Sequence, residues 1–372
     1  MRARDARARV GVARATPRDR RARPRPRADA EARSNGARAA NELPTVLREV
    51  DDAARALDAA RAAIAVAMRA RGRNAVAERK RDSTIATVAD VAAQVACARA
   101  LRGGEGEDFV GEETTRALDG DADVVTAILT ACGAGVDETE ARERLRETSG
   151  GIGRYWVCDP LDGTKAFAAS DDDDADKQYV LGLALMSDVG TPEIAVMIAP
   201  KWPGGGLEVV AARGRGCFAR SRDDETSAFR RVSCAQPKAL SDANVVISAH
   251  ESFESLPLGR AGVSPARVRR LCCGSLCKYV DVVAGSSSIF IQHAKEGGDD
   301  ACVNSWDHAA GVLCAEEAGC VVTDLHGRSL GFLGRDGDRR RFSPGGGGVI
   351  CAAKSVHENV VRAFREGIAM SS

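Results

Sequence analysis

The sequence predicts a protein that contains both helices and strands, of the α/β (α+β) class, divided into two subdomains. A long amphipathic helical pattern comes first, several strand patterns then follow one another directly, and strands alternate with helices in the last third. Successive strands without intervening helices favour an antiparallel meander over a βαβ array. With 372 residues and 44% hydrophobic composition the chain can bury a substantial core. We place the subdomain boundary near residue 235, which gives subdomains 43–235 and 236–372.

The first predicted elements are helical. Apolar residues recur at intervals of three, four and seven over residues 43–71, which is typical of a helix with one buried face. A second helix is expected over 87–101, a short strand at 109–110, and polar helical structure over 115–150. Strands are then expected at 155–157, 179–186, 193–198, 207–212 and 217–218, as the meander.

The last third alternates between the two kinds of element. Strands are expected at 245–248, 288–291 and 349–352, and helices at 275–285, 308–319 and from about 356 onward. The helix over 308–319 ends at a glycine, as helix C-termini commonly do.

The zero net charge of the chain hides an asymmetry. Residues 1–40 contain 13 Arg and 4 acidic residues, a surplus of 9, so the remaining residues carry −9. An acidic body argues against nucleic acid as a partner. The Arg-rich start cannot build a core, and we expect residues 1–42 to be disordered. Its Arg and Ala bias is typical of a transit peptide for a mitochondrion or chloroplast. The alternative is an untranslated or low-complexity extension, encoded in an Arg/Ala-biased genome, on a cytoplasmic protein.

The absence of a long apolar run and the spacing of the cysteines bear on membrane insertion and on the redox state of the thiols. No uncharged apolar run approaches the ~18 residues of a membrane span, so we expect a soluble protein with no membrane partner. Twelve cysteines at irregular spacing, without a secretory signal, favour reduced thiols that serve as small core residues. The cluster over residues 272–277 is compatible with a zinc or redox site, but it lacks a second Cys/His pair at ligand spacing.

The segment D-P-L-D-G-T at 159–164 gathers two carboxylates and a hydroxyl directly after the predicted strand at 155–157. Asp159 and Asp162 are close enough to reach one hard cation or two neighbouring ones. Gly163 and Thr164 can open a helix whose free N–H groups face a phosphate. An ordinary Asp-rich turn that caps a helix is the alternative.

Further acidic residues favour the cation site over the ordinary turn, namely Asp90 in T-V-A-D, Glu112 in G-E-E, and Asp307 in W-D-H-A-A. Together with D-P-L-D-G-T, their order resembles the inositol monophosphatase-like superfamily of Mg²⁺-dependent, lithium-sensitive phosphatases from about residue 45 onward. Within it, T-V-A-D, G-T-K-A-F, S-L-C-K-Y and R-R-F-S-P-G-G-G most resemble the plant organelle-type 3'(2'),5'-bisphosphate nucleotidases. The resemblance implies a layered αβαβα sandwich. Repulsion among so many carboxylates is tolerable only around cations, which agrees with that reading.

The resemblance also implies roles for individual residues. Two or three Mg²⁺ ions would be bound by Glu112, Asp159, Asp162, Asp307 and the carbonyl of Leu161. Asp90 and Thr164 would orient and deprotonate the attacking water. Phosphate would lie on the N–H groups at Gly163 and Thr164. The nucleotide would be bound by Ser275, Lys278 and His250, with Asp307 also touching substrate.

Departures from the family pattern bear on the substrate. Gln292 stands where many nucleotidases have Arg, so a bidentate phosphate contact is missing. An insertion, Asp171–Asp176, adds negative charge near the D-P-L-D-G-T segment. We predict hydrolysis of adenosine 3',5'-bisphosphate (PAP) to AMP and phosphate with Mg²⁺. The alternatives are an inositol monophosphate or polyphosphate phosphatase, fructose bisphosphatase, and a non-catalytic member of the family.

Overall fold

The computed structural model describes residues 42–71, 76–80, 85–101, 107–146, 152–169, 174–224, 226–293, 302–334 and 337–369. The predictions of disorder and of a transit peptide over residues 1–42 concern a segment that lies, apart from its last residue, outside the described residues. Residues Asp171–Asp173 of the acidic insertion also lie outside them.

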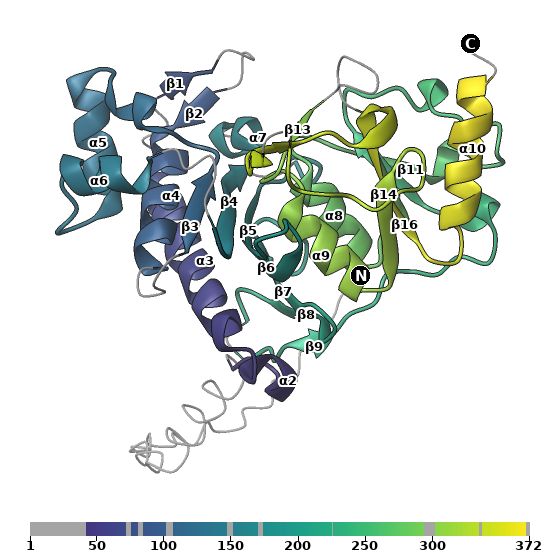
Figure 1. The fold of residues 1–372 in the computed structure, drawn as a ribbon, viewed down its shortest axis with the longest axis horizontal. Helices are drawn as coiled ribbons and strands as arrows, with labels where there is room; N and C mark the ends of the chain where they lie inside the picture. The colour runs from purple at the N-terminus through teal and green to yellow at the C-terminus, as the bar shows by residue number, and fades with distance from the viewer. Residues whose placement is uncertain are drawn as a thin grey trace, which may run out of the picture.

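Two main sheets organise the described chain (Figure 1). The larger sheet has seven strands in the order β3 (Asp108–Gly111), β4 (Tyr155–Asp162), β5 (Val180–Met186), β6 (Pro192–Ala199), β7 (Leu207–Ala212), β8 (Gly216–Ser221) and β9 (Arg230–Arg231). β3 pairs with β4 in parallel, and every later pair in this sheet is antiparallel. The predicted meander is confirmed.

The second sheet has five strands in the order β11 (Val268–Leu271), β10 (Val245–Ser248), β12 (Ile289–His293), β16 (Gly348–Ala353) and β14 (Cys320–Asp324). β10 pairs in parallel with β11 and β12, whereas β16 is antiparallel to both its neighbours. β11 is not predicted from the sequence, because Arg269 and Arg270 interrupt its apolar pattern, and β14 is not predicted either.

Helices cover the sheets in alternating layers. The helices are α2 (Thr45–Arg48), α3 (Asp51–Ala70), α4 (Val88–Ala100), α5 (Ala122–Cys132), α6 (Glu138–Arg144), α7 (Thr164–Ala168), α8 (Leu276–Val283), α9 (Ala309–Glu317) and α10 (His357–Ala369). α3 and α4 share a core with one face of the large sheet, and α8 and α9 lie between its other face and the small sheet. α10 packs against β16 at the outside (Figure 1). The αβαβα sandwich is confirmed.

Small elements complete the fold. β1 (Val76–Arg79) and β2 (Ile85–Thr87) form an antiparallel pair beside α4, and β13 (Val303–Asn304) pairs with β15 (Arg341–Phe342). α5 and α6 share a separate small core with α4. The main core contains residues from both predicted subdomains, and the boundary near 235 stays a prediction. In the part of the chain that the structure describes, no helix is long and apolar enough to cross a membrane.

Two local expectations are corrected. The D-P-L-D segment is not a turn after a strand, because β4 itself continues to Asp162 with an irregular register between Asp159 and Asp162. Pro160 lacks an N–H for the ladder, which is one reason for such an irregularity. The expectation of reduced thiols is wrong for Cys272 and Cys273, which form a disulfide. The structure places none of the other ten cysteines in a disulfide.

Candidate active site

Three carboxylates converge where β4 ends near α9. Asp159 and Asp162 come from β4, and Asp307 precedes α9. Each offers one carboxylate oxygen, and these oxygens lie within 4.8 Å of one another. Asp159 and Asp162 are buried, at 1% and 6% exposure. Hydrogen bonding to the N–H of Leu161 (3.0 Å) helps to orient the Asp159 carboxylate.

The electrostatics of this cluster fit a cation. Burial, followed by the charge of Glu112, raises the pKa of Asp159 well above its ordinary value. Burial likewise raises the pKa of Asp307, with Asp162 as the next contributor. Burial raises the pKa of Asp162 to about 7, although the charge of Lys278 opposes the shift. Several hard oxygen donors that repel one another in a buried site suit a divalent cation such as Mg²⁺.

A second group of residues lies beside the carboxylates. Asp90 and Thr87 form a capping box at the start of α4, in which Asp90 Oδ2 accepts from the Thr87 N–H at 2.8 Å. The Thr164 hydroxyl lies 2.9 Å from Asp90 Oδ1 and 3.2 Å from the Leu161 carbonyl oxygen. Its single proton can serve only one of these acceptors at a time. Burial raises the pKa of Asp90 to about 6, despite the hydrogen bonds from Thr87 and Thr164.

Gly163 precedes α7 and turns the chain sharply. Its φ is +96°, a left-handed conformation, and a Cβ placed there would lie 2.6 Å from the Gln178 carbonyl oxygen. A side chain at this position therefore meets both strain and a clash. Gly163 sets the position of Thr164, the first residue of α7, opposite Asp90.

Glu112 lies in the same site, but it has a partner that sequence reasoning missed. The Lys80 ammonium donates to Glu112 at 2.6 Å and to Glu113 at 2.8 Å. Burial lowers the pKa of Lys80, yet the charges of Glu113 and Glu112 outweigh it and hold that pKa above its ordinary value. Burial raises the pKa of Glu113 to about 8, against the opposing charge of Lys80. In the sequence Lys80 stands only in a basic run, Arg79–Arg81, and nothing there marks it out.

Gln94 fixes the backbone of this acidic pair. Its amide donates to the Glu113 carbonyl oxygen and accepts from the Glu113 N–H, both at 2.8 Å. A Cβ added to Gly111 would lie 2.2 Å from the Gln94 side chain, so the two pack without spare room. The G-E-E segment is thus held against α4 by one buried amide.

The predicted substrate residues are placed differently from one another. Ser275 is the N-cap of α8, and its hydroxyl donates to Gln292 Oε1 at 2.6 Å. Lys278 is only 1% exposed, and its ammonium donates to the Gly274 carbonyl. His250 is exposed in the turn after β10, and we find no hydrogen bond or ion pair for its imidazole among the described residues. The structure brings Lys278 close to Asp162, whereas the role of His250 stays a prediction.

The layered fold and the buried acidic centre define a class of α/β proteins with a carboxylate site suited to divalent cations. A model of the inositol monophosphatase family matches residues 47–369. The chain belongs to this family, and membership implies a metal-dependent site.

Individual relatives refine the comparison. An Arabidopsis thaliana protein named "Putative 3'(2'),5'-bisphosphate nucleotidase, mitochondrial" is 32% identical over 227 residues, which are 56% of this chain and 55% of that protein. A Dictyostelium discoideum protein named 3'(2'),5'-bisphosphate nucleotidase is 25% identical and covers 78% of this chain and 88% of its own. The match thus spans about half of the first relative. The solved IMPase of Thermotoga maritima shares the fold, with TM-score 0.57, 21% identity, and coverage of 85% of this chain and 97% of its own.

Proposed function

We propose that this protein is a phosphoric monoester hydrolase, a Mg²⁺-dependent 3'(2'),5'-bisphosphate nucleotidase that converts adenosine 3',5'-bisphosphate to AMP and phosphate. The observation that carries the proposal is the convergence of Asp159, Asp162 and Asp307 within 4.8 Å, beside the Asp90 and Thr164 pair. The names of the curated relatives support the nucleotide as substrate.

The acidic residues of the carboxylate centre would bind the metal ions. Asp159, Asp162, Asp307, Glu112 and the Leu161 carbonyl would hold two or three Mg²⁺ ions. Bound Mg²⁺ would supply positive charge that neutralises the phosphate and favours ionisation of water. The family resemblance and the carboxylate chemistry support this set.

The remaining residues would place the reactants. The Thr164 hydroxyl, which hydrogen-bonds to Asp90, would orient the attacking water. A proton of that water would pass through the hydroxyl to the Asp90 carboxylate. The N–H groups at Gly163 and Thr164 would bind the transferred phosphate, and in-line attack would release the nucleoside hydroxyl without a covalent intermediate. Ser275, Lys278 and His250 would bind the rest of the nucleotide.

One observation favours a second candidate, an inositol phosphate phosphatase. Gln292 Oε1 accepts a hydrogen bond from the Ser275 hydroxyl at 2.6 Å, and the neutral Gln292 side chain supplies no positive charge that could bind a second phosphate. The centre would be unchanged, and the substrate would be a small polyol phosphate.

Phosphate release by the full chain with Mg²⁺ tests the two candidates. The substrates are adenosine 3',5'-bisphosphate, inositol 1-phosphate and inositol 1,4-bisphosphate, with Asp159→Ala as the blank. We expect kcat/KM to favour the nucleotide about 100-fold, which is roughly 2.7 kcal/mol of differential transition-state binding. A preference for the inositol esters would overturn the substrate, and no release from any of them would favour a non-catalytic family member. Inhibition by lithium is expected in the same assay.

We also propose import into an organelle, a mitochondrion being favoured by the name of the first relative. Residues 1–42 fused to a fluorescent protein should accumulate in that organelle. Diffuse cytoplasmic fluorescence would contradict the proposal.

A further inference from the structure

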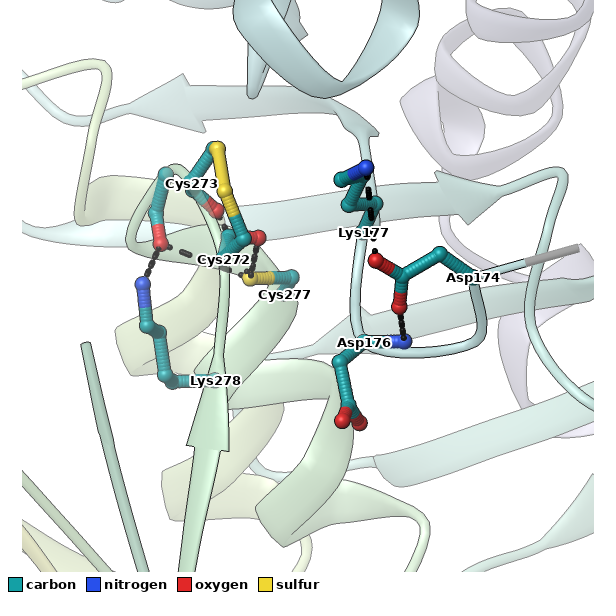
Figure 2. Close-up of a disulfide and its surroundings, with 8 residues drawn as sticks. Asp174, Asp176, Lys177, Cys272, Cys273, Cys277 and Lys278 are labelled. Carbon is teal, nitrogen blue, oxygen red and sulfur yellow. Dashed lines mark hydrogen bonds and ion pairs between the residues drawn. A yellow bond between two sulfur atoms is a disulfide. The ribbon is translucent and has the colours of Figure 1, made fainter. Parts of the chain in front are cut away.

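The disulfide between Cys272 and Cys273 lies in the short connection between β11 and α8 (Figure 2). Both cysteines are half-buried, unlike Cys277, which is fully buried four positions beyond Cys273. The connection from Cys272 to Ser275 has no assigned role in the proposed hydrolysis except at Ser275. It nevertheless touches the carboxylate centre.

The contact with the centre is made through Asp162. The N–H of Leu276 donates to Asp162 Oδ2 at 2.5 Å, and the N–H of Cys277 also hydrogen-bonds this carboxylate. A Cβ added to Gly274 would lie 1.9 Å from Asp162 Oδ1, so the backbone of Gly274 passes directly against the same group. The position of the Asp162 carboxylate therefore depends on the path of the backbone over residues 274–277, which directly follow the disulfide.

The same connection supports two buried side chains of α8. The Gly274 carbonyl accepts from the Lys278 ammonium, and the Cys273 carbonyl lies 3.0 Å from the Cys277 thiol (Figure 2). Lys278 is also the cation whose charge acts on Asp162. A shift of this backbone would thus move both a hydrogen-bond donor to Asp162 and the cation beside it.

The other side of the disulfide contacts Asp176 and Lys177, at the C-terminal end of the acidic insertion. The N–H of Cys272 donates to the Asp176 carbonyl oxygen at 2.9 Å, and Cys272 forms a parallel bridge with Lys177. Arg269 lies 3.6 Å from the Asp176 carboxylate. The residues before Cys273 are therefore anchored, and a change of backbone conformation at Cys273 is transmitted toward Gly274 and Leu276.

Cys273 has the backbone conformation that such a change requires. Its φ is +69°, and among the described residues it is the single non-glycine residue with positive φ. L-residues disfavour this region, and they keep it only where the surroundings impose it. The bond to Cys272 closes a small ring through this backbone, so cleavage of the bond removes one restraint that holds the conformation.

We propose that Cys272 and Cys273 are a redox modification site that sets the affinity of the carboxylate centre for Mg²⁺. A dithiol reductant would act through a thiolate that attacks one sulfur of the pair and forms a mixed disulfide. Its second thiol would resolve that bond, leaving two cysteine thiols and an oxidised reductant, with two electrons and two protons transferred. A disulfide oxidant would reverse the reaction. The disulfide form is the one in which Leu276 and Gly274 hold Asp162. The inference rests on the proposed function only in taking Asp162 as a metal ligand.

The test uses the full chain in an oxidised form and after reduction by dithiothreitol. Mass spectrometry of alkylated peptides reports whether Cys272 and Cys273 are bonded, and calorimetry without substrate reports the Mg²⁺ dissociation constant. We expect reduction to raise that constant about fivefold or more, the lower end of typical coupling between sites. Phosphate release against Mg²⁺ concentration should shift in parallel.

Three variants make the result specific. The double variant C272S/C273S should bind Mg²⁺ as the reduced protein does and ignore dithiothreitol. Cys273→Gly tolerates positive φ without the disulfide, and it should stay nearer the oxidised form in both conditions. Cys302→Ser, which removes an exposed thiol elsewhere, should respond to reduction like the parent chain.

The outcomes separate the two proposals. Absence of the disulfide from protein purified without reductant, or equal Mg²⁺ affinity in the two forms, overturns the redox inference. Phosphate release with the same dependence on Mg²⁺ concentration in both forms does so as well, while it supports the proposed function. Redox-dependent Mg²⁺ binding without release of phosphate from any tested ester supports the redox site and overturns the proposed hydrolysis.

Discussion

Replacing Asp90 by asparagine tests the proposed route of the proton. The variant keeps the size of the side chain and one of the two oxygens, which can still accept from the Thr87 N–H, while its amide NH2 replaces the oxygen that accepts from the Thr164 hydroxyl. It removes the negative charge and the basic site. A positioned general base contributes about 10²- to 10⁴-fold, so kcat/KM should fall by that factor, or roughly 2.7–5.4 kcal/mol of transition-state stabilisation.

The measurement is initial phosphate release at saturating Mg²⁺, with thermal unfolding to confirm the fold. Thr164→Val should cause a loss of similar size, and the double variant should lose little more, because residues that act as a unit are not additive. Asp324→Asn is the matched control, since Asp324 is also buried and accepts from backbone N–H groups, but it lies in β14 outside the site. A fall of less than about tenfold in Asp90→Asn would refute the proposed base, because that is below the range for general-base catalysis.

Three further predictions concern charge. Burial raises the pKa of Asp162 to about 7 and of Glu113 to about 8, so between about pH 4 and these values the metal-free native state binds more protons than the unfolded state. Its stability should therefore fall as pH rises, and Mg²⁺ should suppress the fall; calorimetric melting temperatures that rise with pH in EDTA would contradict this. Lys80→Met leaves Glu112 and Glu113 without their cation, and it should cost about 3 kcal/mol of unfolding free energy without Mg²⁺ in urea titrations, with Lys354→Met as the control; equal values would reject the role of the ion pair. Replacing Asp171–Asp176 by a short neutral link should lower KM at low salt through reduced repulsion of a polyanionic substrate, and an unchanged KM would reject it.

Much of the fold was accessible from periodicity because it depends on local pattern. β7 has its predicted bounds, and the terminal helix and the meander strands lie within a few residues of theirs. β11 was not predicted, because its two arginines interrupt the apolar pattern of a strand and the strand is stabilised by pairing with β10. Pairing partners are set by contacts distant in sequence, which a window of residues does not contain.

The candidate site divides in the same way. The capping box of Thr87 and Asp90 and the D-P-L-D-G-T segment are local motifs, and the sequence by itself determined them. Tertiary structure alone decided that Lys80 would neutralise Glu112 and that the N–H of Leu276 would meet Asp162, 114 residues away. The physical reason is that a buried charge must be hydrogen-bonded or paired, and its partner is the group that packing places beside it. That packing follows from the arrangement of the layers.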